Sequence, residues 1–424
     1  MSYIVKPFAK KKVKAELTLP GSKSITNRCL VISALARGKT ELSNVLFSDD
    51  TFYMMKVLKD LGLKIDVDED KRRVVIEGGM LPHGEHSFFV GNAGTTMRFL
   101  SSYLSLGGGS FLLDGDERMR ERPIQDLLDV LNKLGVNIFS VKGNGCPPVR
   151  INSKGIKGGR AKLSGKNSSQ YLSSVLMSAP YAVGDVILCV DGEITSRPYA
   201  EMTLNIMKEF GVSVKNSGFK EFAVTPSEYI SLSSYYIEPD ASTASYFLAA
   251  TAILSGEIKI RGLGKNSIQG DTNFIKILEM MGCEIDVGED FIKLVSDGNL
   301  DGIEIDMNDV PDLVPTLAII ALFARTPTKI FNVANLRIKE SDRLKALSNE
   351  IKKIGGKVNE FDDGLEIYPE ICYNSSLIST YNDHRIAMAF SIAGLKIGGI
   401  EIDNPGCVSK SFPEFFNFLE RFFN

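Results

Sequence analysis

The 424-residue chain has few of the features that indicate a membrane, a metal or a nucleic acid. Its longest apolar stretch, residues 313–324, has 12 residues and is too short to span a bilayer. Histidine occurs three times, with two copies in the turn-like "PHGEHS", so a histidine-based metal centre is not expected. The formal net charge is −3, without the basic excess that accompanies nucleic-acid binding.

Cysteine pairs and targeting segments are also missing. The six cysteines include no CxxC pair, which favours reduced thiols over a disulfide framework or a zinc site. The opening "MSYIVKPFAKKKVKAEL" is basic but leads into no apolar segment, so neither a signal peptide nor a membrane anchor is expected. These absences favour a cytoplasmic protein. The length of 424 residues predicts two or three domains, and 44% hydrophobic and 24% charged residues are ordinary globular values.

An internal repeat organises the chain. Five amphipathic helical segments each end in a glycine followed by an alternating run, and the glycines are 73, 76, 71 and 73 residues apart: Gly62, Gly135, Gly211, Gly282 and Gly355. A glycine at this position can take the left-handed conformation that ends a helix, and the alternating run predicts a half-buried strand. The terminal "FPEFFNFLERFFN" predicts a sixth helix of this kind without its strand.

A second set of six segments alternates with the first. Each begins with polar capping residues and continues almost wholly apolar: "SKSITNRCLVISALARG", "NAGTTMRFLSSYLSLGG", "SSQYLSSVLMSAP", "PDASTASYFLAATAILSG", "PDLVPTLAIIALFA" and "NDHRIAMAFSIAGLKIGG". Helices that are apolar on nearly all sides are buried, whereas their N-termini carry free N–H groups that attract anions.

These patterns predict an α/β protein of six βαβαββ-like units in two lobes of three. We expect one lobe to comprise residues 1–21 and 238–424, the other to comprise 22–237, and the active site to lie in the cleft between them. A set of unrelated α/β domains with ordinary helix caps is the alternative.

Candidate binding residues in the first half gather at the polar helix starts. Cations and hydroxyls suit phosphate or carboxylate oxygens, and uncharged amides and hydroxyls also suit polyols. The candidates are Lys23, Ser24 and Arg28; Asn92, Gly94 and Thr95; Arg122; Ser168, Ser169 and Gln170; and Ser196 and Tyr199. "GSKS" lacks the GxxxxGK[ST] order of a nucleotide P-loop, so ATP is not implied. Plain N-capping is the simpler interpretation of Ser196.

The second half adds carboxylates to the cations. Its candidates are Asp312, Asn335, Lys339, Glu340, Arg343, Asp383, His384, Arg385 and Lys410. On a helix start Lys339 and Arg343 would be i, i+4 neighbours with Glu340 beside them, although a solvated salt-bridge face is the simpler interpretation of such a charge run. Capping is the simpler role for Asp312. A carboxylate among cations is expected to have a depressed pKa.

Taken together, these segments resemble the 5-enolpyruvylshikimate-3-phosphate synthase family. The matching stretches follow the family's order over almost the whole chain: "LPGSKSITNR", "GNAGTTMR", "DGDERMRERPI", "SSQYLSS", "SRPYAEMT", "EPDASTASYF", "QGDTNF", "PDLVPTLA", "RIKESDRL", "YNDHRIAMAFS" and "SKSFPEFF". The resemblance implies a two-lobed inside-out α/β barrel. It also implies transfer of the enolpyruvyl group of phosphoenolpyruvate to the 5-hydroxyl of shikimate 3-phosphate, with no metal or organic cofactor.

The resemblance also assigns roles. Asp312 would be the base and Glu340 the acid, with Lys23 and His384 assisting. The shikimate 3-phosphate residues would be Lys23, Ser24, Arg28, Ser168, Ser169, Gln170, Ser196, Tyr199, Asp312, Asn335 and Lys339. The phosphoenolpyruvate residues would be Lys23, Gly94, Arg122, Gln170, Arg343, Arg385 and Lys410. The implied protein is a monomer with small-molecule substrates and with neither nucleic acid nor membrane as partner.

Two alternatives remain on the same scaffold. A UDP-N-acetylglucosamine enolpyruvyl transferase typically has Lys-Asn where this chain has Lys23-Ser24, and it usually carries a cysteine in the loop that here reads "DGDERMRERPI". A non-catalytic anion-binding protein would not need Asp312 and Glu340. Thr96 and Phe99 replace the Ala and Pro of many relatives, but Gly94 is present, so we hypothesise that the family inhibitor glyphosate binds.

Overall fold

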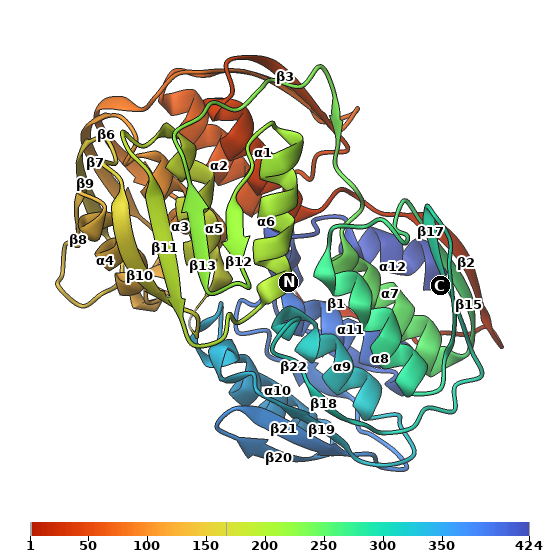
Figure 1. Ribbon diagram of the computed structural model, residues 1–424. Coiled ribbons are helices and arrows are strands. Elements are labelled where there is room, and N and C mark those ends of the chain that lie inside the picture. Colours follow the sequence, from red (N-terminus) through yellow and green to blue (C-terminus); the bar gives the residue numbers. More distant parts are fainter. Residues whose placement is uncertain (1, 167, 424) are drawn as a thin grey trace. The chain divides into compact units, whose positions relative to one another are not determined.

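The computed structural model describes residues 2–166 and 168–423. The chain forms two compact units: the first comprises Met1–Pro20 and Glu238–Asn424, and the second comprises Gly21–Ile237. Six small sheets and twelve α-helices make up the described part (Figure 1).

One βαβαββ unit of the second compact unit shows the repeating pattern. Its elements are β6 (His83–Phe89), α3 (Gly94–Tyr103), β7 (Gly108–Asp114), α4 (Gln125–Lys133), β8 (Asn137–Ser140) and β9 (Val149–Lys154). The strands are ordered β6-β7-β9-β8, with β6 parallel to β7 and β9 antiparallel to both neighbours. The helix between the parallel strands is the buried type, and the helix before the hairpin is the amphipathic type.

The other two repeats of the second unit follow the same order. One consists of β10 (Gly159–Ser164), α5 (Ser169–Ser178), β11 (Val186–Asp191), α6 (Arg197–Glu209), β12 (Lys215–Ser217) and β13 (Glu221–Val224). The other consists of α1 (Lys23–Leu35), β3 (Gly38–Ser43), α2 (Asp49–Asp60), β4 (Lys64–Asp68), β5 (Arg73–Gly78) and, as its opening strand, β14 (Tyr235–Tyr236). This repeat is therefore completed by a strand about 200 residues away in the sequence.

The first unit has two complete repeats. One contains β2 (Val13–Thr18), α7 (Ala241–Leu254), β15 (Gly256–Arg261), α8 (Phe274–Met280), β16 (Glu284–Val287) and β17 (Phe291–Ser296). The next contains β18 (Glu304–Asp306), α9 (Val314–Ala321), β19 (Thr328–Phe331), α10 (Arg343–Lys353), β20 (Lys357–Phe361) and β21 (Gly364–Tyr368). In the first of these, β2 pairs in parallel with β15 across the whole insertion of the second unit.

The third repeat of the first unit lacks its hairpin. It consists of β22 (Ser376–Ile378), α11 (His384–Ile397), β23 (Ile400–Ile402) and α12 (Phe415–Phe423). The N-terminal β1 (Tyr3–Ile4) pairs antiparallel with β23 and occupies the place of the missing strand. The predicted sixth helix without a strand is confirmed.

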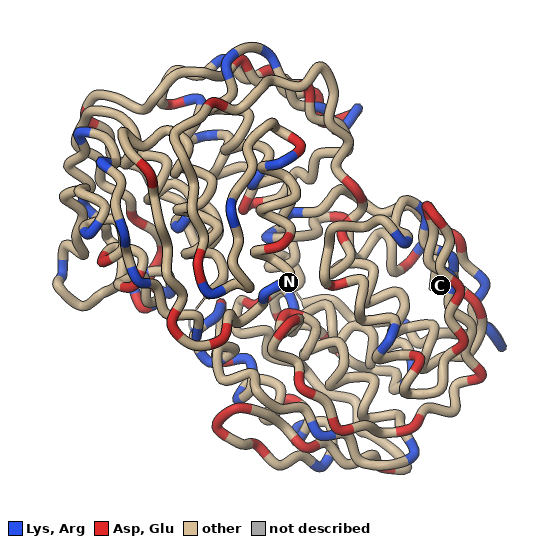
Figure 2. The backbone as a smooth tube through the Cα atoms, viewed as in Figure 1, with Lys and Arg blue, Asp and Glu red and all other residues tan. Residues whose placement is uncertain are grey.

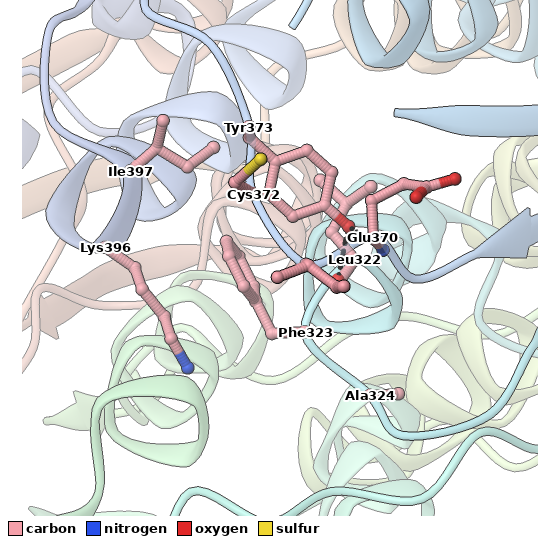
Figure 3. A pocket seen from close by; sticks show the side chains of 9 residues that line it. Leu322, Phe323, Ala324, Glu370, Cys372, Tyr373, Lys396 and Ile397 are labelled. Atoms are coloured by element: carbon pink, nitrogen blue, oxygen red, sulfur yellow. Dashed lines mark hydrogen bonds between the residues drawn. The ribbon is translucent and has the colours of Figure 1, made fainter. Parts of the chain in front are cut away.

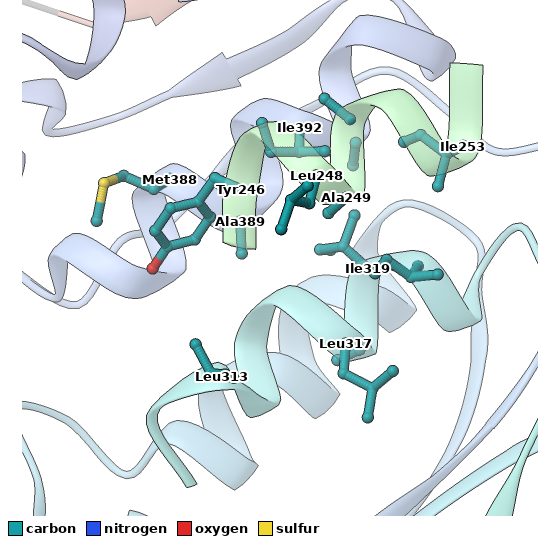
Figure 4. Close-up of a cluster of buried hydrophobic side chains, with 14 of the residues drawn as sticks. Tyr246, Leu248, Ala249, Ile253, Leu313, Leu317, Ile319, Met388, Ala389 and Ile392 are labelled. Carbon is teal, nitrogen blue, oxygen red and sulfur yellow. The ribbon is translucent and has the colours of Figure 1, made fainter. Parts of the chain in front are cut away.

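Buried helices form the core of each unit, with the sheets outside them. In the first unit α7, α9 and α11 pack together through aliphatic side chains (Figure 4), and almost every residue of α7 is buried. Strands such as β15 alternate between buried and partly exposed residues, which shows that one face of the sheet covers the helices. Charged residues of both signs are interspersed along the surface strands and loops (Figure 2). This is the predicted inside-out α/β arrangement.

The repeat glycines end their helices as expected. Gly62 and Gly282 have φ values of 97° and 105°, and the other three lie in the same left-handed region. A side chain at such a φ would be strained, which explains why glycine recurs there.

Candidate active site

The starts of the buried helices carry the predicted polar residues. Side-chain oxygens cap four of these helices: Ser22 for α1, Ser168 for α5, Asp240 for α7 and Asp383 for α11. The start of α3 at Gly94 has no side-chain cap, and α9 is preceded by the 3₁₀ helix Pro311–Leu313. Backbone N–H groups at such ends suit anionic ligands.

In the first unit Asp312 lies among three cations. Its carboxylate accepts from Arg343 Nη1 at 2.9 Å and from Arg385 Nη2 at 2.9 Å, and Lys339 Nζ lies 3.8 Å away. Burial by itself would raise the pKa of Asp312, but the charges of Arg385, Lys339 and Arg343 outweigh burial and hold this pKa well below its ordinary range. The depressed pKa expected for a carboxylate among cations is confirmed for Asp312, and helix capping is not its role.

Arg343 is the centre of this cluster and is 1% exposed. Besides Asp312, it donates from Nη2 to Glu340 Oε2 at 2.8 Å and from Nε to Asp383 Oδ2 at 2.8 Å. Lys410 Nζ lies 3.8 Å from Glu340 Oε1. Burial would lower the pKa of Arg343, but the three carboxylates raise it above its ordinary value. The solvated salt-bridge face considered for this segment is therefore wrong.

Asp383, a candidate from the sequence to which no specific role was assigned, belongs to this cluster. It is fully buried, and besides Arg343 its carboxylate accepts from Ser341 Oγ at 3.0 Å and from the backbone N–H of Arg385 at 2.9 Å. His384 is buried beside it, with Nδ1 3.6 Å from Asp383 Oδ1. An aspartate before "HR" at a helix start made Asp383 a candidate, but the sequence did not identify Arg343 as its partner.

Lys339 and Arg343 do not share a helix, which corrects one expectation. The 3₁₀ helix Ala334–Ile338 ends before Lys339, whose backbone is extended, and α10 begins at Arg343. The two cations meet at Asp312 and not along a helical face. No donor among the described residues lies within hydrogen-bond range of the buried Oδ1 of Asn335, so this atom is suited to a ligand hydroxyl.

In the second unit Arg28 brings three predicted residues together. Its guanidinium donates to the backbone oxygens of Ser24 and Tyr199 at 2.8 and 3.2 Å, and to Thr203 Oγ1 at 2.7 Å. A weaker bond of 3.4 Å reaches Ser173 Oγ. Arg28 is 1% exposed, and burial lowers its pKa to about 10. Its Cζ lies 5.2 Å from the ring centre of Phe99, one of the two departures from the family pattern.

Lys23 lies at the start of α1 and contacts a carboxylate that was not predicted from the sequence. Its Nζ is 3.3 Å from Asp50 Oδ2, and Asp50 is almost fully buried in the first turn of α2. Thr96, the other departure from the family pattern, donates from Oγ1 to the backbone oxygen of Asp50 at 2.9 Å. Thr96, in the first turn of α3, therefore holds the backbone of Asp50, whose carboxylate contacts Lys23.

Gly94 faces Arg122 closely. A Cβ on Gly94 would lie 2.7 Å from Arg122 Nη2, and this guanidinium is held by Asn92, whose Oδ1 accepts at 2.9 Å. Arg122 is 4% exposed. The small residue at the start of α3 therefore leaves room for a buried cation.

Gln170 links α5 to α3. Its Oε1 accepts from Arg98 at 2.6 Å and its Nε2 donates to Thr95 at 3.3 Å. Ser168 caps the helix at Gln170 N, and the adjacent Ser169 is buried. These contacts bring the second and third predicted helix starts together.

Ser196 stands at the N-cap position of α6 with a left-handed φ of 58°, but its hydroxyl makes no cap bond. The simple capping role considered for Ser196 is therefore wrong, and its hydroxyl is available for another role.

A separate cavity of about 420 Å³ lies in the first unit at the C-terminal ends of α9 and α11 (Figure 3), whereas Asp312 and Asp383 lie at their N-terminal ends. Leu322, Phe323, Tyr373 and Lys396 line it, and the Lys396 ammonium already donates to the backbone oxygen of Ile253 at 2.7 Å. None of the predicted site residues lines this cavity.

Known proteins match the chain over nearly its full length. A family model described as EPSP synthase (3-phosphoshikimate 1-carboxyvinyltransferase) matches residues 8–419. The chain belongs to the EPSP synthase family. A 3-phosphoshikimate 1-carboxyvinyltransferase of Vibrio vulnificus is 46% identical over 413 residues, covering 96% of each chain, and one of Sulfurovum is 43% identical over 423 residues, covering 99% and 98%.

A solved EPSP synthase from Acinetobacter baumannii superposes with a TM-score of 0.81 at 28% identity, covering 99% of this chain and 98% of that one. The EPSP synthase fold expected from the sequence motifs is thus confirmed. Within the described residues, no helix is long and apolar enough to cross a membrane, and no group of three or more His, Cys, Asp or Glu side chains could hold a metal ion.

Proposed function

We propose that this chain catalyses the EPSP synthase reaction: the 5-hydroxyl oxygen of shikimate 3-phosphate attacks C2 of phosphoenolpyruvate, and phosphate then leaves. The observation that carries the proposal is the pairing of Asp312 and Glu340 with Arg343 at the helix starts of a chain from this family. A binding protein would gain nothing from placing two carboxylates where anionic ligands bind.

The proposed reaction has two steps, an addition and an elimination, and each step transfers protons. In the addition, C3 of phosphoenolpyruvate gains a proton, C2 becomes electrophilic, and the attacking hydroxyl loses its proton to a base. In the elimination, the C3 methyl group loses a proton as the C2–phosphate bond breaks, which restores the double bond. We assign the base role to Asp312 and the C3 proton transfers to Glu340, with Lys23 and His384 assisting.

The remaining residues bind the two substrates. In our proposal, Arg343, Arg385, Lys410, Gly94, Arg122 and Gln170 hold phosphoenolpyruvate together with Lys23. Shikimate 3-phosphate contacts Lys23, Ser24, Arg28, Ser168, Ser169, Gln170, Ser196, Tyr199, Asp312, Asn335 and Lys339. The concentration of arginines supports this assignment, because guanidinium groups bind carboxylate and phosphate bidentately.

The domain assignment from the sequence is part of the proposal. We propose that residues 1–21 with 238–424 and residues 22–237 act as two lobes that serve one pair of substrates. We also propose a cytoplasmic monomer within aromatic amino-acid biosynthesis; a dimer in analytical ultracentrifugation would contradict the oligomeric part.

Phosphate release tests the function. Purified protein should release phosphate when both substrates are present and none with either alone. Glu340→Ala should retain shikimate 3-phosphate binding and lose most turnover. Turnover of UDP-N-acetylglucosamine in place of shikimate 3-phosphate, or binding without phosphate release, would contradict the proposal.

A further inference from the structure

The loop between β22 and α11 has an unusual backbone. Tyr381 and Asn382 both have positive φ values, 55° and 53°, and the N–H of Asp383 donates to the backbone oxygen of Thr380 at 2.9 Å. Two consecutive positive φ values closed by such a bond are the pattern of a type I′ turn, which favours asparagine and glycine. A tyrosine in its first central position is strained, and strain of this kind persists only where surrounding contacts enforce it.

Glu350 on α10 supplies contacts of this kind. Its side chain is 1% exposed, Oε1 accepts from Tyr381 Oη at 2.9 Å, and Oε2 accepts from the backbone N–H of Ser379 at 3.0 Å. Lys353, one turn later, donates to the same Oε2 at 2.5 Å and to the backbone oxygen of Leu377 at 3.2 Å. This buried carboxylate has no part in the proposed reaction.

Residues after β23 hold the loop from another direction. Asp403 Oδ1 accepts from both the backbone N–H and the hydroxyl of Thr380, at 3.0 and 2.8 Å. Asn404 Nδ2 donates to Asn382 Oδ1 at 3.2 Å. All four loop residues, Ser379–Asn382, are therefore bonded to side chains outside the loop.

The loop leads directly into the charged cluster. Asp383 follows Asn382, orients Arg343 and caps α11, and Arg385 bonds Asp312. A change in the turn would move Asp383 and Arg385 together, because the backbone between them is one helix start.

We propose that Glu350 and Tyr381 are positioning residues. By stabilising the strained turn, they fix the positions of Asp383 and Arg385 for the binding of phosphoenolpyruvate. The inference rests on the proposed function for its substrate. Neither residue touches the reacting atoms; both act through the backbone of the turn.

Three variants test the role of Glu350. Glu350→Met removes both acceptors and should raise the KM for phosphoenolpyruvate about tenfold or more, with the KM for shikimate 3-phosphate within about twofold, because buried donors are left unsatisfied. In Glu350→Gln the KM for phosphoenolpyruvate should stay within about threefold of the wild-type value. The amide oxygen can still accept from Ser379 and Lys353, and the Tyr381 hydroxyl can accept from the amide nitrogen. Ile351→Ala, a fully buried neighbour on α10, is the control for lost stability.

The turn itself is tested by a matched pair at Asn382. Glycine and alanine both lose the bond to Asn404, but only alanine resists a positive φ, so Asn382→Ala should raise the KM for phosphoenolpyruvate about fivefold above Asn382→Gly. This pair and Tyr381→Phe decide the question if Glu350→Met fails to fold.

Hydrogen exchange separates this inference from the proposed function. The amides of Ser379, Asp383 and Arg385 should exchange about tenfold faster in Glu350→Met than in Ile351→Ala, whether or not the substrates are turned over. An inactive wild type overturns the proposed function alone. If Glu350→Met and Ile351→Ala show equal hydrogen exchange at these amides, or equal KM values for phosphoenolpyruvate, the positioning role is overturned.

Discussion

Replacing Gly94 by alanine should weaken phosphoenolpyruvate binding while leaving the fold intact. The added Cβ would lie 2.7, 2.8 and 2.9 Å from three atoms of the Arg122 guanidinium, closer than real Cβ contacts come. Arg122 is buried and bonded to Asn92, so it cannot move aside without losing that bond. Overpacking of this kind costs about 1–3 kcal/mol.

Arg122 can relieve the clash by giving up its bond to Asn92 and turning away, so much of the cost should appear in ligand binding. Gly94 has no positive φ, and alanine is a better helix residue than glycine by about 0.5–1 kcal/mol, which offsets part of the strain in the folded chain. If the 1–3 kcal/mol falls on the ligand pocket, the KM for phosphoenolpyruvate rises about 5- to 150-fold. We expect glyphosate to compete with phosphoenolpyruvate in the wild type. Its inhibition of Gly94→Ala should be weaker by a similar factor.

Steady-state phosphate release at varied phosphoenolpyruvate, combined with thermal unfolding, measures both sides of this prediction. Gly108→Ala is the matched control, because a Cβ there meets no atom within 4 Å. A KM for phosphoenolpyruvate within twofold of wild type in Gly94→Ala would refute the placement of Arg122 at that ligand. Wild-type activity without glyphosate competition at millimolar concentration would refute the inhibitor hypothesis.

Three further substitutions probe charge and burial. Asp383→Asn should lower the free energy of unfolding by about 3 kcal/mol or more in urea, because it removes one carboxylate from the buried Arg343; a loss under 1 kcal/mol would contradict this. Burial raises the pKa of Asp271 from 3.8 to about 6, so the folded chain keeps a proton that the unfolded chain releases and stability falls as pH rises through this window. Asp271→Asn should reduce the stability difference between pH 4 and pH 8 by about 2 kcal/mol, and an unchanged difference would exclude Asp271 as the titrating group. Phe99→Leu removes the ring beside Arg28 and should raise the KM for shikimate 3-phosphate about threefold to tenfold, whereas an effect confined to phosphoenolpyruvate would contradict that role.

The local elements were predictable because each depends on neighbouring residues. The left-handed φ of Gly62 and Gly282 and the caps at Ser168 and Asp240 follow from residue type and spacing alone. The strands that complete three repeats were not predictable in this way. β1, β2 and β14 pair with strands far away in the sequence, and short-range patterns carry no information about such partners.

The partners of the charged residues were also beyond what local sequence patterns can predict. Sequence spacing placed Lys339 and Arg343 on one helix, but the chain is extended at Lys339 and Asp312 joins the two cations instead. Asp50 and Asp383 were not predicted to contact Lys23 and Arg343, because an aspartate at a helix start is explained equally well as a cap. Tertiary contacts decide between these roles.

The balance of charges in the cluster around Arg343 bears on both substrate binding and the proposed proton transfer. Four cations, Lys339, Arg343, Arg385 and Lys410, face three carboxylates, Asp312, Glu340 and Asp383. Asp383 is fully buried and accepts from Arg343 Nε. If phosphoenolpyruvate binds here as proposed, its carboxylate would compete with Asp312 and Glu340 for the other N–H groups of Arg343. Each N–H that the substrate took from Asp312 would remove part of the attraction that depresses the pKa of this carboxylate. In the proposed mechanism, Asp312 would therefore become a stronger base when phosphoenolpyruvate is bound, which is when the reaction requires one.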